Sequence, residues 1–144
     1  MIKRMTLLLI SQILLLAISG CSPSEPPIQL SGVWARPANV DGNSAVYFTI
    51  RSRRTADTLL SATCPIADHV QIHFSRTFDD GTVQMEPRDF VNLPAGTWIY
   101  FLPGGLHIML EGLDTPLAQG DTFPLTLHFE NSEDITIDVP VRNQ

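Results

Sequence analysis

The segment HVQIHFS at residues 69–75 decides the class of fold. Its apolar residues Val70, Ile72 and Phe74 alternate with polar residues, which is the period of a β-strand that buries one face. The segment LTLHFE at residues 125–130 repeats this alternation. Beyond residue 20, no segment keeps a helical period over three turns. These patterns predict an all-β protein.

Short runs of the same kind follow one another along the chain, and turn-forming residues separate them. The breaks at 41–43, 79–81, 94–96, 103–105 and 120–121 combine Gly with Asp, Asn or Pro, which favour turns. Many short strands at regular spacing are typical of a β-sandwich or barrel. The expected strands are 28–34, 44–51, 58–63, 69–75, 82–86, 97–102, 106–113, 121–130 and 135–141.

The first twenty residues predict a signal peptide rather than a part of the fold. Residues 1–4 are basic, and the apolar stretch 5–18 is shorter than the about 20 apolar residues of a membrane-spanning helix. The sequence ISGC at 18–21 resembles the lipobox of bacterial lipoproteins, so Cys21 is the expected lipidation site. Ordinary cleavage that leaves an unmodified thiol is the alternative. Ser22 favours sorting to the outer membrane if the host is Gram-negative.

The rest of the sequence predicts one domain on a tether. We expect a Pro-rich tether at 21–30, held to the membrane by the lipid, and a β-sandwich domain at 31–144. The chain of 144 residues is 44% hydrophobic and 17% charged, which is enough apolar sequence for a core. Beyond residue 20 the charged residues are seven arginines and fifteen carboxylates, a net charge of −8. No basic patch can form from this set, so nucleic acid is excluded as a partner.

The stretch GGLHIML at 104–110 carries the clearest chemical signal. On a strand His107 and Met109 share one face, with their α-carbons about 6.6–7 Å apart. His73 lies on the polar face of its expected strand, and Met85 follows the next turn, so a hairpin would bring the two close. Two imidazoles and two thioethers form a soft, uncharged ligand set that suits Cu(I), suits Zn(II) less well and does not suit Ca²⁺ or Mg²⁺.

Each of the four residues also has an ordinary explanation. His107 alone could be a hydrogen-bonded surface histidine. His73 alone could equally be a metal ligand or an ordinary surface histidine, and Met85 alone is more often a core residue. The hypothesis of a metal site therefore depends on their combination and spacing.

The spacing resembles that of the periplasmic copper chaperones of the PCuAC type. Their pattern is a His, often followed by Met, then ten residues, a Met, twenty-one residues and His-x-Met. His73, Met85, His107 and Met109 match all four positions, while Phe74 replaces the frequent Met and is expected to point away from the site. Further similar stretches are WARP at 34–37, AVY at 45–47, PGGLHIML at 103–110 and PLTL at 124–127.

The resemblance implies a cupredoxin-like Greek-key β-sandwich that is not an enzyme. It implies a periplasmic protein that binds Cu(I) and delivers it to the copper centres of respiratory oxidases. Together with the lipobox at Cys21, it predicts an extracytoplasmic or periplasmic, membrane-anchored lipoprotein. The implied partner is a copper-accepting protein, such as an oxidase subunit or another copper chaperone. The sequence departs from some members, which carry a His- and Met-rich C-terminal tail, because it ends in VRNQ.

Three other functions stay open on the sequence alone. A copper buffer for tolerance would use the same ligands. An electron-transfer cupredoxin would need a thiolate, and Cys64 is the thiol that remains if Cys21 is acylated. A plain adhesion or assembly sandwich would leave the His and Met residues incidental. His69 is a possible auxiliary ligand, and we expect His128 to be a solvated side chain.

Overall fold

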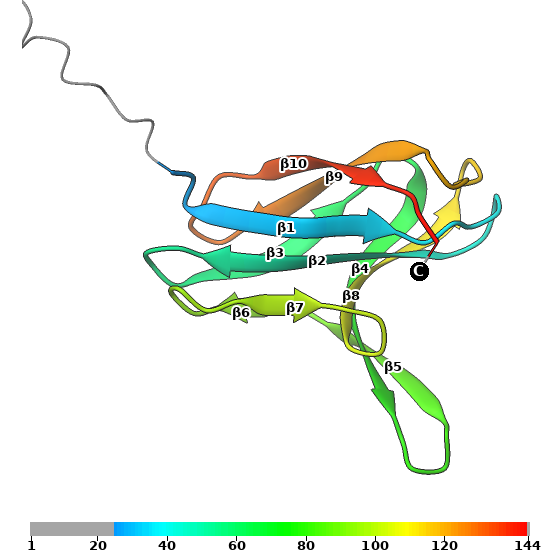
Figure 1. Ribbon diagram of the computed structural model, residues 1–144, viewed down its shortest axis with the longest axis horizontal. Coiled ribbons are helices and arrows are strands. Elements are labelled where there is room, and N and C mark those ends of the chain that lie inside the picture. Colours follow the sequence, from blue (N-terminus) through cyan, green and yellow to red (C-terminus); the bar gives the residue numbers. More distant parts are fainter. Residues whose placement is uncertain (1–24, 144) are drawn as a thin grey trace, which may run out of the picture.

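Two β-sheets packed face to face build the domain (Figure 1). The computed structural model describes residues 25–143. The larger sheet has six strands in the order β1-β2-β7-β8-β4-β5, and the smaller has four in the order β10-β9-β3-β6. Within the described residues, no helix is long and apolar enough to cross a membrane. The strands are β1 (Ile28–Ala35), β2 (Ser44–Ser52), β3 (Asp57–Thr63), β4 (Ala67–Thr77), β5 (Val83–Arg88), β6 (Val91–Leu93), β7 (Ile99–Phe101), β8 (Leu106–Leu113), β9 (Thr122–Phe129) and β10 (Ile135–Pro140).

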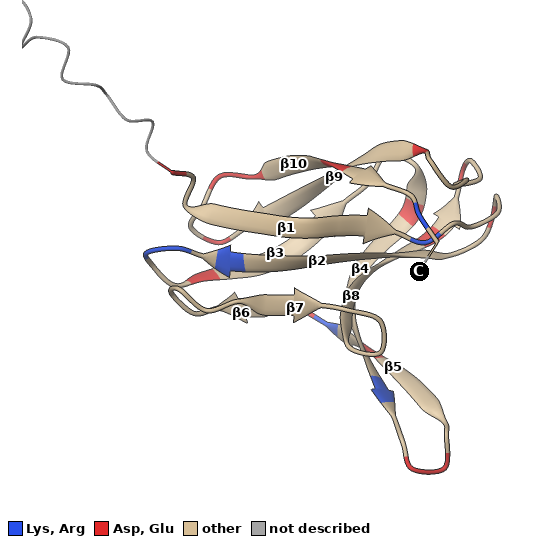
Figure 2. Ribbon diagram, in the orientation of Figure 1, with Lys and Arg blue, Asp and Glu red and all other residues tan. Residues whose placement is uncertain are grey.

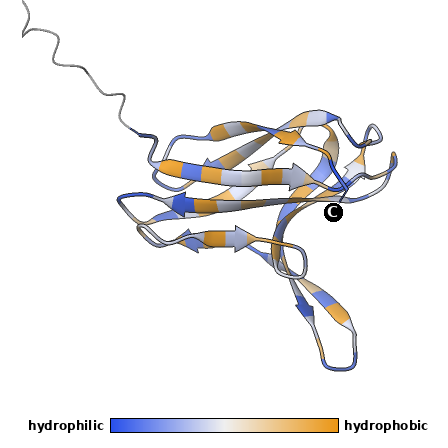
Figure 3. Ribbon diagram, in the orientation of Figure 1, coloured by the Kyte–Doolittle hydropathy of each residue, from blue (hydrophilic) through white to orange (hydrophobic). Residues whose placement is uncertain are grey.

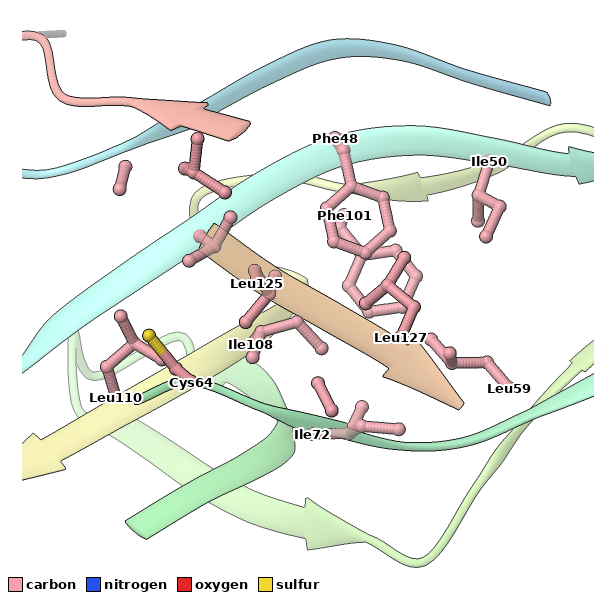
Figure 4. Close-up of a cluster of buried hydrophobic side chains, with 14 of the residues drawn as sticks. Phe48, Ile50, Leu59, Cys64, Ile72, Phe101, Ile108, Leu110, Leu125 and Leu127 are labelled. Atoms are coloured by element: carbon pink, nitrogen blue, oxygen red, sulfur yellow. The ribbon is translucent and has the colours of Figure 1, made fainter. Parts of the chain in front are cut away.

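The core lies between the sheets and is filled by the apolar half of each alternating strand (Figures 3 and 4). Phe48 of β2 stacks on Phe101 of β7 with 4.4 Å between ring centroids. Leu127 of β9 and Ile108 of β8 belong to the same fully buried cluster. Burying a side chain of this size contributes about 1.5–3 kcal/mol. The inner faces of the sheets thus hold the fold, and their outer faces carry the polar residues.

The all-β sandwich predicted from the sequence is confirmed, with differences in two strands. Strand β6 was not expected, because three residues are too few to display an alternation. The expected strand 97–102 is reduced to Ile99–Phe101, since the N–H of Thr97 closes a turn onto the carbonyl oxygen of Pro94 at 3.1 Å.

The hairpin of β4 and β5 extends beyond the rest of the sandwich as an arm (Figure 1). At its tip the N–H of Phe78 donates to the carbonyl oxygen of Thr82 at 2.9 Å, and the carboxylate of Asp80 accepts from the N–H and hydroxyl of Thr82. Figure 2 shows the acidic tip in red. Strand β5 is the edge of the larger sheet, where Pro87 is tolerated because an edge strand needs only half of its hydrogen bonds. Strand β5 of the arm carries one of the expected metal ligands, Met85, and strand β4 carries another, His73.

A β-bulge in β1 changes which side chain reaches the outer face. The register with β2 shifts between Ser31 and Trp34, and Gly32 there has a φ of +62°. A glycine in this left-handed conformation is typical of a bulge that adds one residue to a strand. As a result Trp34 is paired with Tyr47, and both aromatic rings lie on the outer face of the larger sheet.

Candidate metal site

Two histidines face each other on the outer face of the larger sheet. Strands β4 and β8 pair antiparallel with His73 directly opposite His107, and the next pair on this face is Gln71 opposite Met109. The imidazole rings meet edge to face, with 5.7 Å between centroids and 74° between planes. Strand pairing thus brings together three of the four expected ligands, which are up to 36 residues apart in the sequence.

Met85 lies beside this group on the arm. It is paired with Ser75 of β4, the residue two positions after His73, and therefore shares its face. Its side chain is 52% exposed, so it is not the core residue that a lone methionine would suggest. Met85, His107 and Met109 line one open hollow of about 320 Å³. His73 does not line the hollow itself but packs against His107 at its side.

His107 is buried, and its surroundings favour the neutral imidazole. The side chain is 3% exposed, and its Nδ1 donates to the carbonyl oxygen of Gly105 at 3.0 Å. Burial lowers the pKa of His107, and the positive charges of His73 and Arg36 act in the same direction, against the opposing effect of the Gly105 hydrogen bond. A neutral imidazole is the form that binds metal ions.

His73 has a nitrogen without a protein partner. Its Nε2 lies 3.0 Å from Oε1 of Gln71, while Nδ1 is buried and makes no hydrogen bond with the described residues. Buried polar atoms are nearly always partnered, so an orphaned one calls for a further ligand. The nitrogen donors at this place, together with two thioethers, fit a soft metal ion.

Aromatic side chains that the sequence did not assign to the site form one wall beside it. The ring of Tyr47 lies 6.3 Å from that of His107, and Trp34 packs on Tyr47 at 4.7 Å between centroids. The guanidinium groups of Arg36 and Arg142 lie over Tyr47 and Trp34, at 5.2 and 5.1 Å from the ring centroids. Burial raises the pKa of Tyr47, so its phenol stays protonated. The wall shields one side of His107 from water.

Cys64 lies away from His73 and His107, in the core between the sheets (Figure 4). Its side chain is 8% exposed, and Sγ lies 3.4 Å from the carbonyl oxygen of Pro124. Burial raises the pKa of the Cys64 thiol, which opposes formation of the thiolate that a copper ligand requires. Cys21, the expected lipidation site, lies outside the described residues.

The other two histidines occupy different surroundings. His69 is paired with Glu111, on the same strands as His73 and His107 but four residue pairs further along. His128 was expected to be solvated, but both of its ring nitrogens are within hydrogen-bond distance of protein groups, at 2.8 Å from Asp134 and 2.9 Å from Thr63. Within residues 25–143, no group of three or more His, Cys, Asp or Glu side chains could hold a metal ion. A metal site at His73 and His107 therefore depends on the methionines.

Comparisons with known proteins give the chain a family and a fold. The family described as "Putative lipoprotein LpqE-like" matches residues 28–141. "Uncharacterized protein RP573" of Rickettsia prowazekii (strain Madrid E) is 33% identical, with 84% of this chain and 70% of that protein covered. "Putative lipoprotein Lxx21020" of Leifsonia xyli subsp. xyli (strain CTCB07) is 28% identical, with 90% and 85% covered.

Two solved structures share the architecture. The copper-bound PCuAC domain from PmoF2 has a TM-score of 0.67 and 23% identity, with 82% of this chain and 94% of that chain covered. The Cu(I) form of DR1885 from Deinococcus radiodurans has a TM-score of 0.59 and 24% identity, with 88% and 85% covered. The fold is thus the cupredoxin-like β-sandwich of PCuAC domains, and the chain belongs to the LpqE-like family.

Proposed function

We propose that this protein is an extracytoplasmic Cu(I)-binding metallochaperone whose ligands are His73, Met85, His107 and Met109. The observation that carries the proposal is the pairing of His73 with His107 across β4 and β8, with both thioethers on the same face. Two solved proteins of this fold, the PCuAC domain of PmoF2 and DR1885, are known in copper-bound forms. The protein carries copper and does no chemistry on a substrate.

The donor set favours Cu(I) over divalent ions. All four ligands are uncharged, and thioethers prefer soft monovalent copper. Among the described residues that line the hollow, Arg36 is the one charged side chain. Its positive charge repels a divalent ion twice as strongly as a monovalent one at the same distance. Zn(II) should therefore bind much more weakly than Cu(I).

Unequal exposure of the ligands suits transfer to another protein. Met85 is half exposed on the arm, whereas His107 is almost completely buried against the sheet. An acceptor can replace the thioether of Met85 first, while the imidazoles still hold the ion. Such stepwise exchange lets a carrier bind tightly and still release its cargo. We propose that the acceptor is a copper-receiving protein, such as an oxidase subunit or another chaperone.

Two other functions would use the same fold differently. An electron-transfer cupredoxin needs a cysteine thiolate at the copper, and the burial of Cys64 on the other side of the sheet argues against it. A copper buffer for tolerance would bind the ion but have no specific acceptor. Transfer, rather than binding, distinguishes a buffer from a chaperone.

A competition titration with a Cu(I) chelator, under oxygen-free conditions, tests the binding site. One equivalent of Cu(I) should bind to the wild-type protein. His107→Ala should lower the affinity by well over tenfold, more than about 1.4 kcal/mol, because it removes the most buried ligand. His128→Ala is the matched control and should leave the affinity unchanged, since His128 lies on the smaller sheet. Equal affinities for the two variants would contradict the ligand assignment.

The same titration, repeated with an isolated oxidase copper domain as acceptor, tests delivery. A chaperone should load the acceptor faster than the free chelator complex does at equal Cu(I) concentration. Equal rates would favour a buffer.

A further inference from the structure

The two paired histidines offer different ring nitrogens for binding. A backbone carbonyl oxygen can only accept a hydrogen bond, so the contact with Gly105 requires a proton on Nδ1 of His107. In the neutral imidazole the other nitrogen, Nε2, then carries the free lone pair. His107 is thus prepared to bind a metal ion through the nitrogen that stands farther from its backbone.

His73 is held in the opposite tautomer. The carboxamide oxygen of Gln71 also only accepts, so its contact at 3.0 Å requires a proton on Nε2 of His73. The free lone pair then lies on Nδ1, which is the buried nitrogen without a hydrogen-bond partner. The hydrogen bond and the orphaned atom are two observations at different nitrogens, and together they leave Nδ1 unoccupied.

We propose that Gln71 is a positioning residue that fixes this tautomer, so that Cu(I) is bound by Nδ1 of His73 and Nε2 of His107. The inference rests on the proposed function and names the donor atoms of its site. Hydrogen bonds to the second nitrogen of a metal-binding histidine fix the tautomer and ring orientation in many metal sites. Gly105 does this for His107, and Gln71 does it for His73.

The use of Nδ1 on His73 but Nε2 on His107 fits the arrangement of the strands. Nδ1 lies closer to its own backbone than Nε2 does, so a shared ion would lie nearer to β4 than to β8. Strand β5 and Met85 are on the far side of β4 from β8. An ion shifted toward β4 is therefore shifted toward Met85, the ligand that comes from β5.

Gln71 can be changed without disturbing the core, because its side chain is exposed on the outer face. Gln71→Leu removes the acceptor and keeps a similar size. Gln71→Glu keeps an acceptor oxygen. Gln84→Leu is the matched control, since Gln84 is adjacent to Met85 and so faces away from the site.

The first test is long-range ¹H–¹⁵N NMR of the copper-free protein at about pH 8, above the imidazole reference pKa of about 6.5. His73 should show the Nε2–H tautomer and His107 the Nδ1–H tautomer. Gln71→Leu should convert His73 to a mixture, while Gln71→Glu and Gln84→Leu should not. An Nδ1–H tautomer of His73 in the wild type, or no change in Gln71→Leu, would overturn the role of Gln71.

The second test adds Cu(I), which is diamagnetic and leaves the spectrum observable. The ¹⁵N shifts of His73 Nδ1 and His107 Nε2 should change most, and Gln71→Leu should bind Cu(I) about 10–100-fold more weakly. Gln71→Glu should stay near the wild-type affinity. A dominant change at Nε2 of His73 would overturn the donor assignment. A complex in which neither nitrogen of His73 responds would instead overturn the proposed ligand set, whatever tautomer the copper-free protein shows.

Discussion

Protons should compete with copper for the imidazoles of the proposed site. Both histidines must be neutral to bind the ion, and thioethers do not titrate in this range. Apparent Cu(I) affinity should be constant above about pH 7.5 and should fall as the pH drops through about 6.5, the reference imidazole pKa. Because burial lowers the pKa of His107, its proton should compete only at still lower pH. A chelator competition from pH 5 to 9, corrected for protonation of the chelator, measures this profile.

The high-pH limb of the same profile is sensitive to Cys64. A thiolate ligand would make the affinity continue to rise toward the thiol reference pKa of about 8.5. Burial raises the pKa of Cys64, which would move such a rise to even higher pH. A rise above pH 7.5 that disappears in Cys64→Ser would place sulfur from this residue at the copper. That result would contradict the ligand set of two histidines and two methionines.

Asp57 gives a second prediction that depends on one side chain. Its carboxylate accepts hydrogen bonds from the backbone N–H groups of Thr58, Asn131 and Ser132 at 2.7, 3.0 and 3.0 Å. Burial opposes ionisation of Asp57, but these hydrogen bonds and one from the Ser132 side chain outweigh it and lower its pKa. Asp57→Asn should reduce the free energy of unfolding at pH 7 by about 1–3 kcal/mol, because an amide N–H₂ would face a backbone donor.

The pH dependence of this loss has a definite sign. A carboxyl group with a lowered folded-state pKa stabilises the fold above its unfolded-state pKa, and that contribution is lost as the pH falls. The difference between wild type and Asp57→Asn in urea unfolding should therefore shrink below about pH 3.8. Asp138→Asn on the exposed side of β10 is the control and should cost little at either pH. A pH-independent difference would contradict the role of ionised Asp57.

Among the structural elements, the bulge of β1 controls the aromatic wall beside His107. Gly32 has a φ of +62°, and a Cβ there would meet nothing within 4 Å. The cost of Gly32→Ala is therefore conformational, about 1–2 kcal/mol for a residue forced into the left-handed region. Gly105→Ala is the control, since its φ is not in this region and its Cβ would make an ordinary 3.6 Å contact. If the two variants unfolded with equal free energies, residue 32 would not be held in the left-handed conformation of the bulge.

The sequence predicted the elements better than it predicted their neighbours. Alternation in 69–75 and 125–130 is a local property, and it identified β4 and β9 and the face that each buries. The pairing of β8 with β4 is non-local, and nothing in the alternation specifies which strands become adjacent. The bulge at Gly32 shifts the register of β1 against β2 by one residue, and this shift turns Trp34 to the outer face. A strict alternation of inward and outward residues does not include such a shift. Strand β6 was missed because it is only three residues long.

The same limit applies to the candidate site. That His107 and Met109 share a face follows from their spacing within one strand. The wall of Tyr47 and Trp34 could not be predicted, because it depends on the pairing of β1 with β2 and of β2 with β8. Gln71 is different, since it lies two residues before His73 and period two places it on the same face. The contact of Gln71 with the imidazole of His73 could therefore have been inferred from the sequence.

For the molecule as a whole, the tether and the candidate site lie at opposite ends of the larger sheet. Ile28 at the start of β1 pairs with Ser52, while Ala35 at its end pairs with Val46, which is also paired with Ile108 next to His107. These two ends of β2 are six residues apart, or about 20 Å at about 3.3 Å per residue. At the tether end, Glu25 forms an ion pair with Arg53. A lipid on Cys21 would therefore hold the domain by the end away from the proposed copper ligands and leave the arm accessible to the proposed acceptor.

This arrangement predicts that anchoring and copper binding can be separated. Cys21→Ser should release the protein from membranes or leave its signal peptide uncleaved, because it removes the expected acylation site. The released protein should still bind one Cu(I) with wild-type affinity, since the tether end contributes no ligand. Cys64→Ser is the matched control: it should remain in the membrane fraction, because that thiol is buried in the core. Membrane fractionation and Cu(I) titration of both variants measure the two properties. If Cys21→Ser stays processed and membrane-bound, the lipid anchor is wrong; if it is released but no longer binds copper, the site depends on the anchored end.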